Sequence, residues 1–271
     1  MKKILVHTTK SGAWCTAELT ESIKDALIYF GFDAVSEYRN RGISSGYDFV
    51  IQVGYGNGFH PHTGIYVFVE TDMIGLRKNY NTILDYTKFT RSLHPFDYKE
   101  DLTADNIYYC PIGYSKHYDT TIPHTDLRDS FCMGRDRYGP ARGEFRKRYN
   151  LWTTDTIVAG KERDELIVTS KININPRPYE NYWFTTLHAS LVVFKGKLLM
   201  QDDVGKDDYN FYRPYMILYT EDDFIDKYNY WLTHDKERHE FEQFIYEDLK
   251  NNHPFEKYFY AAMGDILEEY R

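Results

Sequence analysis

The 271-residue sequence has few cysteines: Cys15, Cys110 and Cys132 lie far apart. No two of them form a Cys-x-x-Cys pair, so neither a zinc site nor a disulfide framework is expected, and a reducing compartment fits best. No apolar run approaches the roughly 18 residues that a membrane-spanning helix needs, and the run after Met1 is too short for a signal peptide. The sequence therefore predicts a cytoplasmic protein without a membrane span.

Several signatures of cofactor and metal binding are also missing. The first turn, residues 8–12, lacks the GxxxxGK[ST] pattern of a phosphate-binding P-loop, and the glycines of residues 54–58 are spaced GxGxG rather than GxGxxG. No Asp-x-Asp pair is present, residues 70–72 being the nearest approach, and the two histidines of residues 60–62 have no third ligand at a convincing spacing. The sequence thus predicts neither a metal nor a bound cofactor.

What the sequence has in quantity is aromatic side chains, at 17%, within a hydrophobic fraction of 42%. Such a content does not stay solvated and predicts a folded core. At roughly 150 residues per domain, the length fits two domains. The net charge of -8 disfavours broad non-specific binding of nucleic acid, although a local basic patch remains compatible with it.

The first half of the chain alternates short apolar runs with an amphipathic segment, which is typical of an α/β domain with a parallel sheet. The first helix has apolar residues at three- and four-residue steps; Thr16 or Thr20 is expected to cap it and Gly31 to end it. The expected strands are 3–8, 34–38, 48–53, 65–69 and 107–111, and the expected helices are 17–30 and 85–93.

A polar stretch at 114–128 reads as an interdomain linker, after which the α/β pattern restarts. The prediction is therefore two Rossmann-like domains, 1–122 and 123–254, with parallel sheets that face a central cleft, and a final helix within 255–271 that packs back on the first domain. The expected strands of this half are 131–134, 165–169, 171–175, 197–200 and 216–219, and the expected helices are 143–149, 187–194, 222–232, 235–249 and 255–269.

The most informative run of motifs lies within residues 171–238. One strand ends in Asn-Ile-Asn-Pro, a second ends at an acid, and a third reads Met-Ile-Leu-Tyr. An acidic helix start and a Tyr-Trp-Leu helix follow, and the segment Cys-Pro-Ile-Gly-Tyr stands well before them. The segments are 111–114, 131–134, 172–176, 198–202, 214–219, 221–225 and 230–238.

In order and spacing these motifs resemble the C-terminal half of GT-B glycosyltransferases, particularly the group that includes the CgeB-like spore-maturation proteins. The resemblance implies an enzyme that moves a sugar from a nucleotide-sugar donor to a hydroxyl acceptor without a metal. It places the donor in the second domain and the acceptor in the first. The family carries a carboxylate near the position of His188 or Leu191 that takes the ribose hydroxyls; no Asp or Glu stands between Asn181 and Gln201 here.

The donor of such an enzyme ends in a diphosphate leaving group, which needs cations and oriented N–H groups because negative charge develops on it. A helix that begins near residue 186 offers free backbone amides. Arginines after the first strand of the second domain suit phosphate, although a solvated basic helix face is the alternative interpretation. Glu180 and Gln201 are the candidates for the ribose. The predicted donor-binding residues are Arg135, Arg137, Asn175, Tyr179, Glu180, Asn181, Thr185, Thr186 and Gln201.

Glu70 and Asp72 follow the fourth strand of the first domain, where a carboxylate faces the ligand side of a parallel sheet. Either is a candidate catalytic base for an acceptor hydroxyl, while Asp72 has the alternative role of capping the next helix. The predicted acceptor-side residues are Thr9, Ser11, Gly12 and His60.

A small molecule, a glycan or a protein is the default acceptor. A hydroxymethylated base in DNA is the alternative, because small DNA-base glycosyltransferases of phages share this architecture and must take the base out of the stack. A third hypothesis is a non-catalytic nucleotide- or sugar-binding protein on a degenerate GT-B scaffold; the missing glycine fingerprint disfavours a fourth, a flavodoxin-like or Rossmann oxidoreductase. The basic residues that suggest DNA are Arg135, Arg137, Arg142, Arg146, Lys147 and Arg148.

Overall fold

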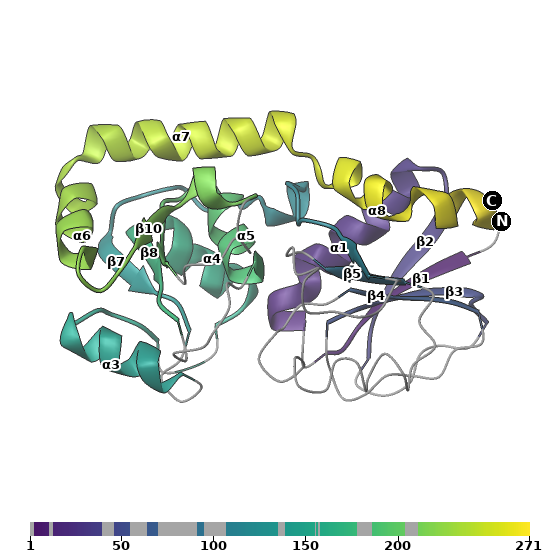
Figure 1. Ribbon diagram of the computed structural model, residues 1–271, viewed down its shortest axis with the longest axis horizontal. Coiled ribbons are helices and arrows are strands. Elements are labelled where there is room, and N and C mark those ends of the chain that lie inside the picture. The colour runs from purple at the N-terminus through teal and green to yellow at the C-terminus, as the bar shows by residue number, and fades with distance from the viewer. Residues whose placement is uncertain are drawn as a thin grey trace. The chain divides into compact units, whose positions relative to one another are not determined.

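The computed structural model describes residues 3–10, 13–39, 46–54, 64–69, 91–94, 107–134, 139–154, 156, 158–177, 186–203 and 211–271. The chain forms two compact units (Figure 1). The first unit comprises Met1–His117 together with His253–Arg271, and the second comprises Tyr118–Asn252. Within the described residues, no helix is long and apolar enough to cross a membrane.

The first unit contains a parallel sheet with the strand order β2-β1-β3-β4-β5-β6. Its central strands β1, β3 and β4 are mostly apolar and almost entirely buried, because both faces of a parallel sheet are covered. The register places Leu5 beside Val50 and Val50 beside Tyr66, and these side chains share one core cluster. The strands are β1 (Lys3–Thr8), β2 (Asp33–Tyr38), β3 (Phe49–Val53), β4 (Ile65–Val69), β5 (Arg91–His94) and β6 (Ile107–Tyr109).

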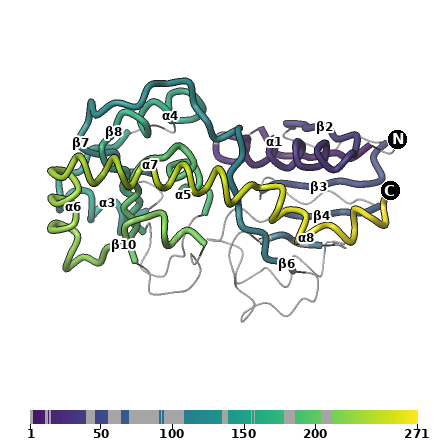
Figure 2. The backbone as a smooth tube through the Cα atoms, turned by 90° about the horizontal axis from the view of Figure 1, so that it is seen from above, coloured from purple at the N-terminus to yellow at the C-terminus, as the bar shows by residue number. Residues whose placement is uncertain are grey.

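Two helices of the first unit, α1 (Ala13–Tyr29) and α8 (Phe255–Tyr270), pack side by side (Figures 1 and 2). The two helices come from opposite ends of the chain. The ring of Tyr270 in α8 packs edge-on against the ring of Phe49 in β3, with 5.0 Å between the ring centroids. Helix α1 ends at Tyr29, and Gly31 terminates it as predicted, because its positive φ of 87° lets the amide of Phe32 reach back to the carbonyl of Leu27.

The predicted cap of this helix was wrong, because α1 begins at Ala13 and both candidate threonines lie inside it. The Thr16 hydroxyl shares a 2.8 Å hydrogen bond with the Thr8 hydroxyl of β1, and Thr20 donates to the carbonyl of Thr16 at 2.8 Å. These buried hydroxyls therefore satisfy each other and the helix backbone instead of capping its free amides.

The second unit contains a parallel sheet with the order β10-β9-β8-β7. Aromatic and aliphatic side chains fill its core, in which the ring of Phe145 packs against Tyr219 and Phe224. The strands are β7 (Arg128–Cys132), β8 (Ser170–Asn175), β9 (Leu199–Asp202) and β10 (Ile217–Tyr219). The helices are α3 (Pro140–Arg148), α4 (Gly160–Val168), α5 (Thr186–Val193), α6 (Phe224–Thr233) and α7 (Asp235–Asn252), with short 3-10 turns at Lys116–Tyr118 and Arg213–Tyr215.

Two expected elements were wrong. Residues 165–169, expected as a strand, form the end of helix α4 and the turn after it. Three successive apolar residues, Leu166 to Val168, resemble a buried strand, but they are buried at the C-terminal end of that helix. Conversely, residues 91–93 of an expected helix form strand β5, where Leu93 pairs in parallel with Val69 and Tyr108.

Candidate functional site

Polar side chains gather at the carboxyl edge of the second sheet. Because β7, β8, β9 and β10 are parallel, their carboxyl ends meet at this edge. The register places Asn175 of β8 beside Gln201 of β9, and Asp202 of β9 beside Tyr219 of β10. Open parallel sheets bind their ligands outside this edge, so it is the first place to look for a site in this unit.

A pair of buried amides lies at the centre of this edge. Asn175 Nδ2 donates to Gln201 Oε1 at 2.7 Å, and Gln201 Nε2 donates to the carbonyl of Asp202 at 3.1 Å. These two hydrogen bonds fix the orientation of both amides. They leave Asn175 Oδ1 buried, with no hydrogen bond to any described residue. A buried acceptor without a partner is costly, so this oxygen is suited to a donor on a ligand.

Arg177 and Asp202 form a bidentate ion pair beside the amides. Arg177 Nε donates to Asp202 Oδ2 at 2.7 Å and Nη2 donates to Oδ1 at 2.8 Å. The hydrogen bonds to Asp202 raise the pKa of Arg177, so the guanidinium stays charged. The Asp202 side chain is 6% exposed, whereas the Arg177 side chain is 33% exposed. The carboxylate thus holds the guanidinium at the edge, where a ligand can still reach it.

A second guanidinium lies at the same edge because a glycine makes room for it. Gly134 follows β7 with a positive φ of 84°, and a Cβ at this position would overlap the guanidinium of Arg142 from α3. Arg142 is buried, and its Nε donates to the carbonyl of Pro176 at 3.2 Å. The guanidinium therefore lies close to the backbone that follows two neighbouring strands, β7 and β8.

Two neutral titratable groups complete the site. Burial, and then the positive charges of Arg142 and Arg163, lower the pKa of His188 in the first turn of α5 to about 3, so its imidazole is neutral at pH 7. Burial and the charge of Asp202 raise the pKa of Tyr219 well above its usual value. Neither His188 Nδ1 nor the Tyr219 hydroxyl has a hydrogen bond to a described residue.

The described part of the edge therefore combines two guanidiniums and the carboxylate of Asp202 with neutral amide, imidazole and phenol groups. Two further carboxylates follow the strands, Asp203 after β9 and Glu221 after β10, and Glu221 pairs with Arg148. The first turn of α5 contains no acidic residue that would oppose the positive end of its dipole. This balance suits an anionic ligand that also carries hydroxyl groups. No group of three or more His, Cys, Asp or Glu side chains within the described ranges could hold a metal ion.

The structure brings two of the predicted donor residues, Asn175 and Gln201, into direct contact, and it places Thr186 at the start of α5. Thr9 lies in the first unit, just after β1, where its carbonyl accepts from the amide of Ala13. The remaining predicted residues lie outside the described part of the chain: Glu70, Asp72, Arg135, Arg137, Tyr179, Glu180, Asn181, Thr185, Ser11, Gly12 and His60.

Sequence reasoning missed Arg177 and Asp202 as site residues, and it assigned Arg142 to a basic surface although the side chain is buried. A usable signal was present for the first two. Asp202 is the last residue of a buried strand and Arg177 stands two residues beyond another, which are the positions that face a ligand in a parallel sheet.

No protein-family model matches the sequence, and no curated protein matches it either. Solved structures do match over nearly the whole chain. An α-glucosyltransferase in complex with UDP and a 13-mer DNA containing a central A:G mismatch has a TM-score of 0.65 at 8% identity, covering 99% of this chain and 100% of that one.

Two further structures agree with it. A sucrose-phosphate synthase from Thermosynechococcus elongatus has a TM-score of 0.61 at 11% identity, covering 100% of this chain and 98% of that one. AviGT4, a glycosyltransferase involved in avilamycin A biosynthesis, has a TM-score of 0.58 at 11% identity, covering 99% of each chain. The chain therefore has the GT-B fold of glycosyltransferases, as its sequence predicted.

Proposed function

We propose that the protein is a glycosyltransferase that moves a sugar from a nucleotide-sugar donor to a hydroxyl acceptor, with the nucleotide held at the carboxyl edge of the second sheet. The observation that carries this proposal is the convergence of Arg142 and Arg177 with the unsatisfied Asn175 Oδ1 at that edge. The similar structures, two of which are glycosyltransferases by title and one of which contains UDP, support it.

The two guanidiniums suit the diphosphate of such a donor. Negative charge develops on this leaving group as the glycosidic bond breaks, and fixed cations stabilise it without having to reorganise. Asp202 prevents Arg177 from swinging away, and burial does the same for Arg142. The first turn of α5 would add backbone N–H groups to the phosphates. Arg135 and Arg137, which follow β7 in the sequence, remain proposed donor residues.

Neutral groups would bind the ribose of the nucleotide. A carboxylate is absent from the first turn of α5, where His188 stands instead. A neutral imidazole has one donor and one acceptor, so it can pair with a hydroxyl in either sense. Asn175 Oδ1 would accept from a second hydroxyl, and the Gln201 side chain would keep that amide in place. Tyr179, Glu180, Asn181, Thr185 and Thr186 remain proposed contacts of the donor.

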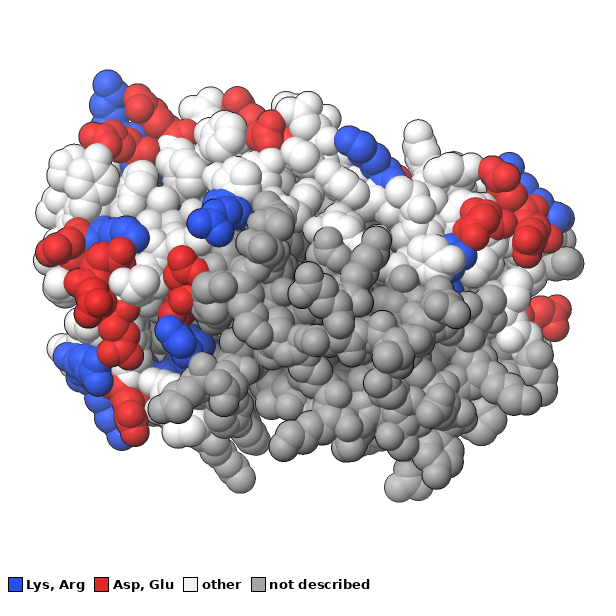
Figure 3. Space-filling model, viewed as in Figure 1, with Lys and Arg blue, Asp and Glu red and all other residues white. Residues whose placement is uncertain are grey.

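We assign the acceptor to the first unit, with Asp72 or Glu70 as the proposed base and with Thr9, Ser11, Gly12 and His60 on the acceptor side. A small molecule, glycan or protein is the favoured acceptor. The DNA-bound α-glucosyltransferase among the similar structures keeps a modified base in DNA as the second candidate. Figure 3 shows basic and acidic side chains interspersed on the described part of the face in view, and Arg148 of α3 pairs with Glu221.

The decisive experiment is a binding screen of the protein against UDP, GDP, ADP, TDP and CMP without added metal. A nucleotide at about 100 times its Kd should add roughly 2.7 kcal/mol to the free energy of unfolding, which thermal denaturation detects. Arg177→Ala should raise the Kd of that nucleotide by about tenfold, a loss of roughly 1.4 kcal/mol. The matched control is Arg148→Ala, which removes the same charge from an exposed position of the same unit and should leave the Kd unchanged.

No response to any of the five nucleotides would contradict the proposal. A response without turnover would favour the non-catalytic binding protein instead. Turnover is measured as release of the responding nucleotide from its glucose, galactose and fucose conjugates in the presence of simple sugars or hydroxymethylated DNA. Asp72→Asn and Glu70→Gln then test the base: if both variants keep full turnover, neither carboxylate serves in that role.

A further inference from the structure

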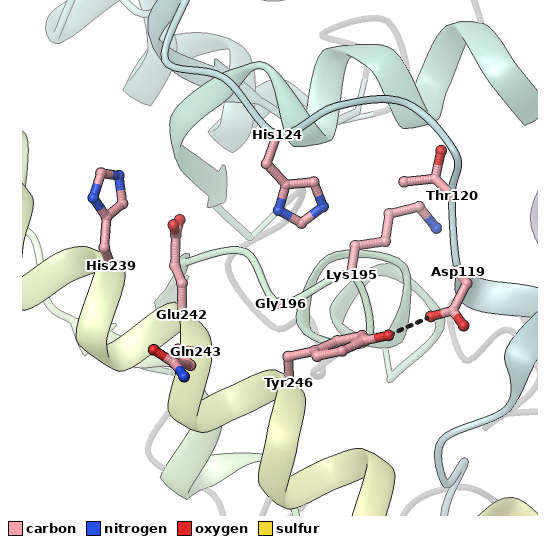
Figure 4. Close-up of a pocket in the computed structure, with 9 residues that line it drawn as sticks. All are labelled: Asp119, Thr120, His124, Lys195, Gly196, His239, Glu242, Gln243 and Tyr246. Carbon is pink, nitrogen blue, oxygen red and sulfur yellow. Dashed lines mark hydrogen bonds between the residues drawn. The ribbon is translucent and has the colours of Figure 1, made fainter.

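A pocket lies at the opposite end of the second unit from the proposed nucleotide site. Its floor is the turn Lys195-Gly196, which connects α5 with β9 and therefore lies at the amino edge of the sheet. One wall comes from the segment between Asp119 and His124, and the other comes from α7 (Figure 4). Its volume of 460 Å³ falls within the range of roughly 300–1,000 Å³ that is typical of small-molecule sites.

The charges beneath this pocket are neutralised within the protein. Lys195 Nζ donates to the carbonyl of Tyr118 at 2.8 Å and lies 3.4 Å from a carboxylate oxygen of Asp164. Glu242 Oε1 accepts from Lys197 Nζ at 2.8 Å and from the amide of Leu198 at 3.2 Å. These buried groups therefore form a fixed polar floor that offers a ligand no uncompensated charge.

An aromatic ring runs along the pocket above that floor. Gly196 has a positive φ of 63°, and a Cβ there would lie 2.8 Å from the Cβ of Tyr246. The missing side chain thus lets Tyr246 of α7 lie close against the turn. In Figure 4 the ring points across the pocket to Asp119, to which its hydroxyl donates at 3.3 Å. Lys250 Nζ donates to the same hydroxyl at 3.1 Å and lies 4.9 Å from the ring centroid, so two groups hold the polar end of the ring beside the pocket.

The rim carries a hydroxyl on Thr120, an amide on Gln243 and imidazoles on His124 and His239. Three of these groups already bond within the protein and keep further hydrogen-bonding capacity: Thr120 accepts from a backbone amide at 3.2 Å, Gln243 donates to a glutamate at 2.8 Å and His239 lies 3.3 Å from an aspartate. Desolvation of the imidazole, followed by the charges of Lys197 and Lys195, lowers the pKa of His124. Its ring is therefore neutral at pH 7.

We propose that this pocket binds a neutral saccharide unit. Its ring hydroxyls would pair with the rim groups, and its C–H face would lie on Tyr246. The site is separate from the carboxyl edge, at which the nucleotide is proposed to bind, because the strands of the sheet lie between the two. It is thus an accessory binding site whose existence does not require the proposed transferase activity.

Saturation-transfer NMR on the full chain, with glucose, galactose, mannose and maltose as probes at millimolar concentration, tests this proposal. At least one probe should receive saturation, both without and with a saturating nucleotide. Tyr246→Ala should raise the Kd of that probe by about tenfold or more, and Tyr246→Phe should retain most of the binding. Gln243→Ala should have an intermediate effect on the Kd. Lys236→Ala, at an exposed position of the same helix, is the matched control and should change nothing.

Three results would overturn the proposal: no saturation of any of the four probes, saturation that Tyr246→Ala and Gln243→Ala both leave intact, or stabilisation against thermal denaturation by sulfate but by none of the sugars. Thermal denaturation of each variant shows whether it is folded, and Tyr246→Phe serves if Tyr246→Ala is not. Nucleotide binding is measured in parallel on the same samples. Because Tyr246 of α7 lies at the amino edge of the sheet and Arg177 lies at its carboxyl edge, failure of sugar binding and failure of the proposed nucleotide site would be seen separately.

Discussion

The two edges of the second sheet treat buried charge differently. At the amino edge, two buried cations lie against carboxylates from other elements, Lys197 with Glu242 at 2.8 Å and Arg238 with Asp126 at 2.7 Å, although Arg238 Nε has no hydrogen bond to a described residue. At the carboxyl edge, the ion pair of Arg177 with Asp202 adjoins polar atoms that have no hydrogen bond to described residues, among them Asn175 Oδ1.

The ion pairs of the two edges differ in the exposure of the cation: the Lys197 and Arg238 side chains are 1% and 0% exposed, whereas the Arg177 side chain is 33% exposed. A cation that is buried together with its carboxylate cannot contact a ligand, and removing one partner leaves the other unpaired in a dry interior. The partly exposed Arg177 can contact a ligand while Asp202 holds it in place. We therefore expect substitutions at the amino edge to lower the free energy of unfolding, and substitutions at the carboxyl edge to lower affinity for a ligand.

The largest expected effect is that of Glu242→Ala. The change leaves the Lys197 ammonium, whose side chain is 1% exposed, without its carboxylate and deprives the Leu198 amide of its acceptor. Breaking a buried pair in this way costs about 3–5 kcal/mol, which urea denaturation measures. The control is Glu240→Ala, two residues away on the same helix, whose pair with Lys236 is exposed and is worth less than about 0.5 kcal/mol. Equal losses in the two variants would break the comparison.

Most strands could be predicted from the sequence because a buried parallel strand reads as a short apolar run. Lys3–Thr8 and Ile65–Val69 have the limits that were expected. The same rule failed where burial, rather than strand structure, produced the run: Leu166 to Val168 are the buried end of α4. Strand β5 was missed because a four-residue element with Arg91 at its start has too little apolar pattern to identify it.

The site could be predicted only in part. Asn175 and Gln201 end apolar strands, so their position at the ligand edge was readable from the sequence. Arg177 follows β8 and Asp202 ends β9, 25 positions further along the chain. Their contact depends on the register between these two strands, which the sequence does not show. The space for Arg142 depends likewise on the positive φ of Gly134, which no residue pattern specifies.

Acid should reveal the neutral imidazole at the carboxyl edge. The pKa of His188 is about 3 in the folded state. Below about pH 6.5 the imidazole is therefore protonated in the unfolded chain but stays neutral in the folded protein. Its contribution to stability is therefore present above pH 6.5 and is lost as the pH falls, by roughly 2 kcal/mol between pH 6.5 and 5. His188→Asn should make the dependence of the free energy of unfolding on pH shallower over this range, and a slope as steep as that of the parent protein would contradict the assignment.

Two glycines of the second unit sharpen the comparison further. Gly134 and Gly160 both have positive φ, 84° and 53°, so alanine at either position should cost about 1–2 kcal/mol of backbone strain. A Cβ at Gly134 would overlap the guanidinium of Arg142, whereas a Cβ at Gly160 would meet no atom of another element within 4 Å. Gly134→Ala should therefore also weaken binding of the responding nucleotide, by about tenfold, whereas Gly160→Ala should not. Titration calorimetry on both variants decides, and equal nucleotide affinities would remove Arg142 from the proposed site.

The smallest effect is expected from Arg148→Ala on α3, which bears on DNA as the acceptor. Its exposed pair with Glu221 should be worth less than about 0.5 kcal/mol of stability. A phosphate contact would appear as a change of about 0.9 in the slope of log affinity against log salt for a 13-mer duplex. Because Glu221 already compensates this arginine, we expect the slope to stay the same, as it should for the exposed neighbour Lys147→Ala. A lower slope in either variant would show that this helix contacts DNA and would move a modified base ahead of the other acceptors.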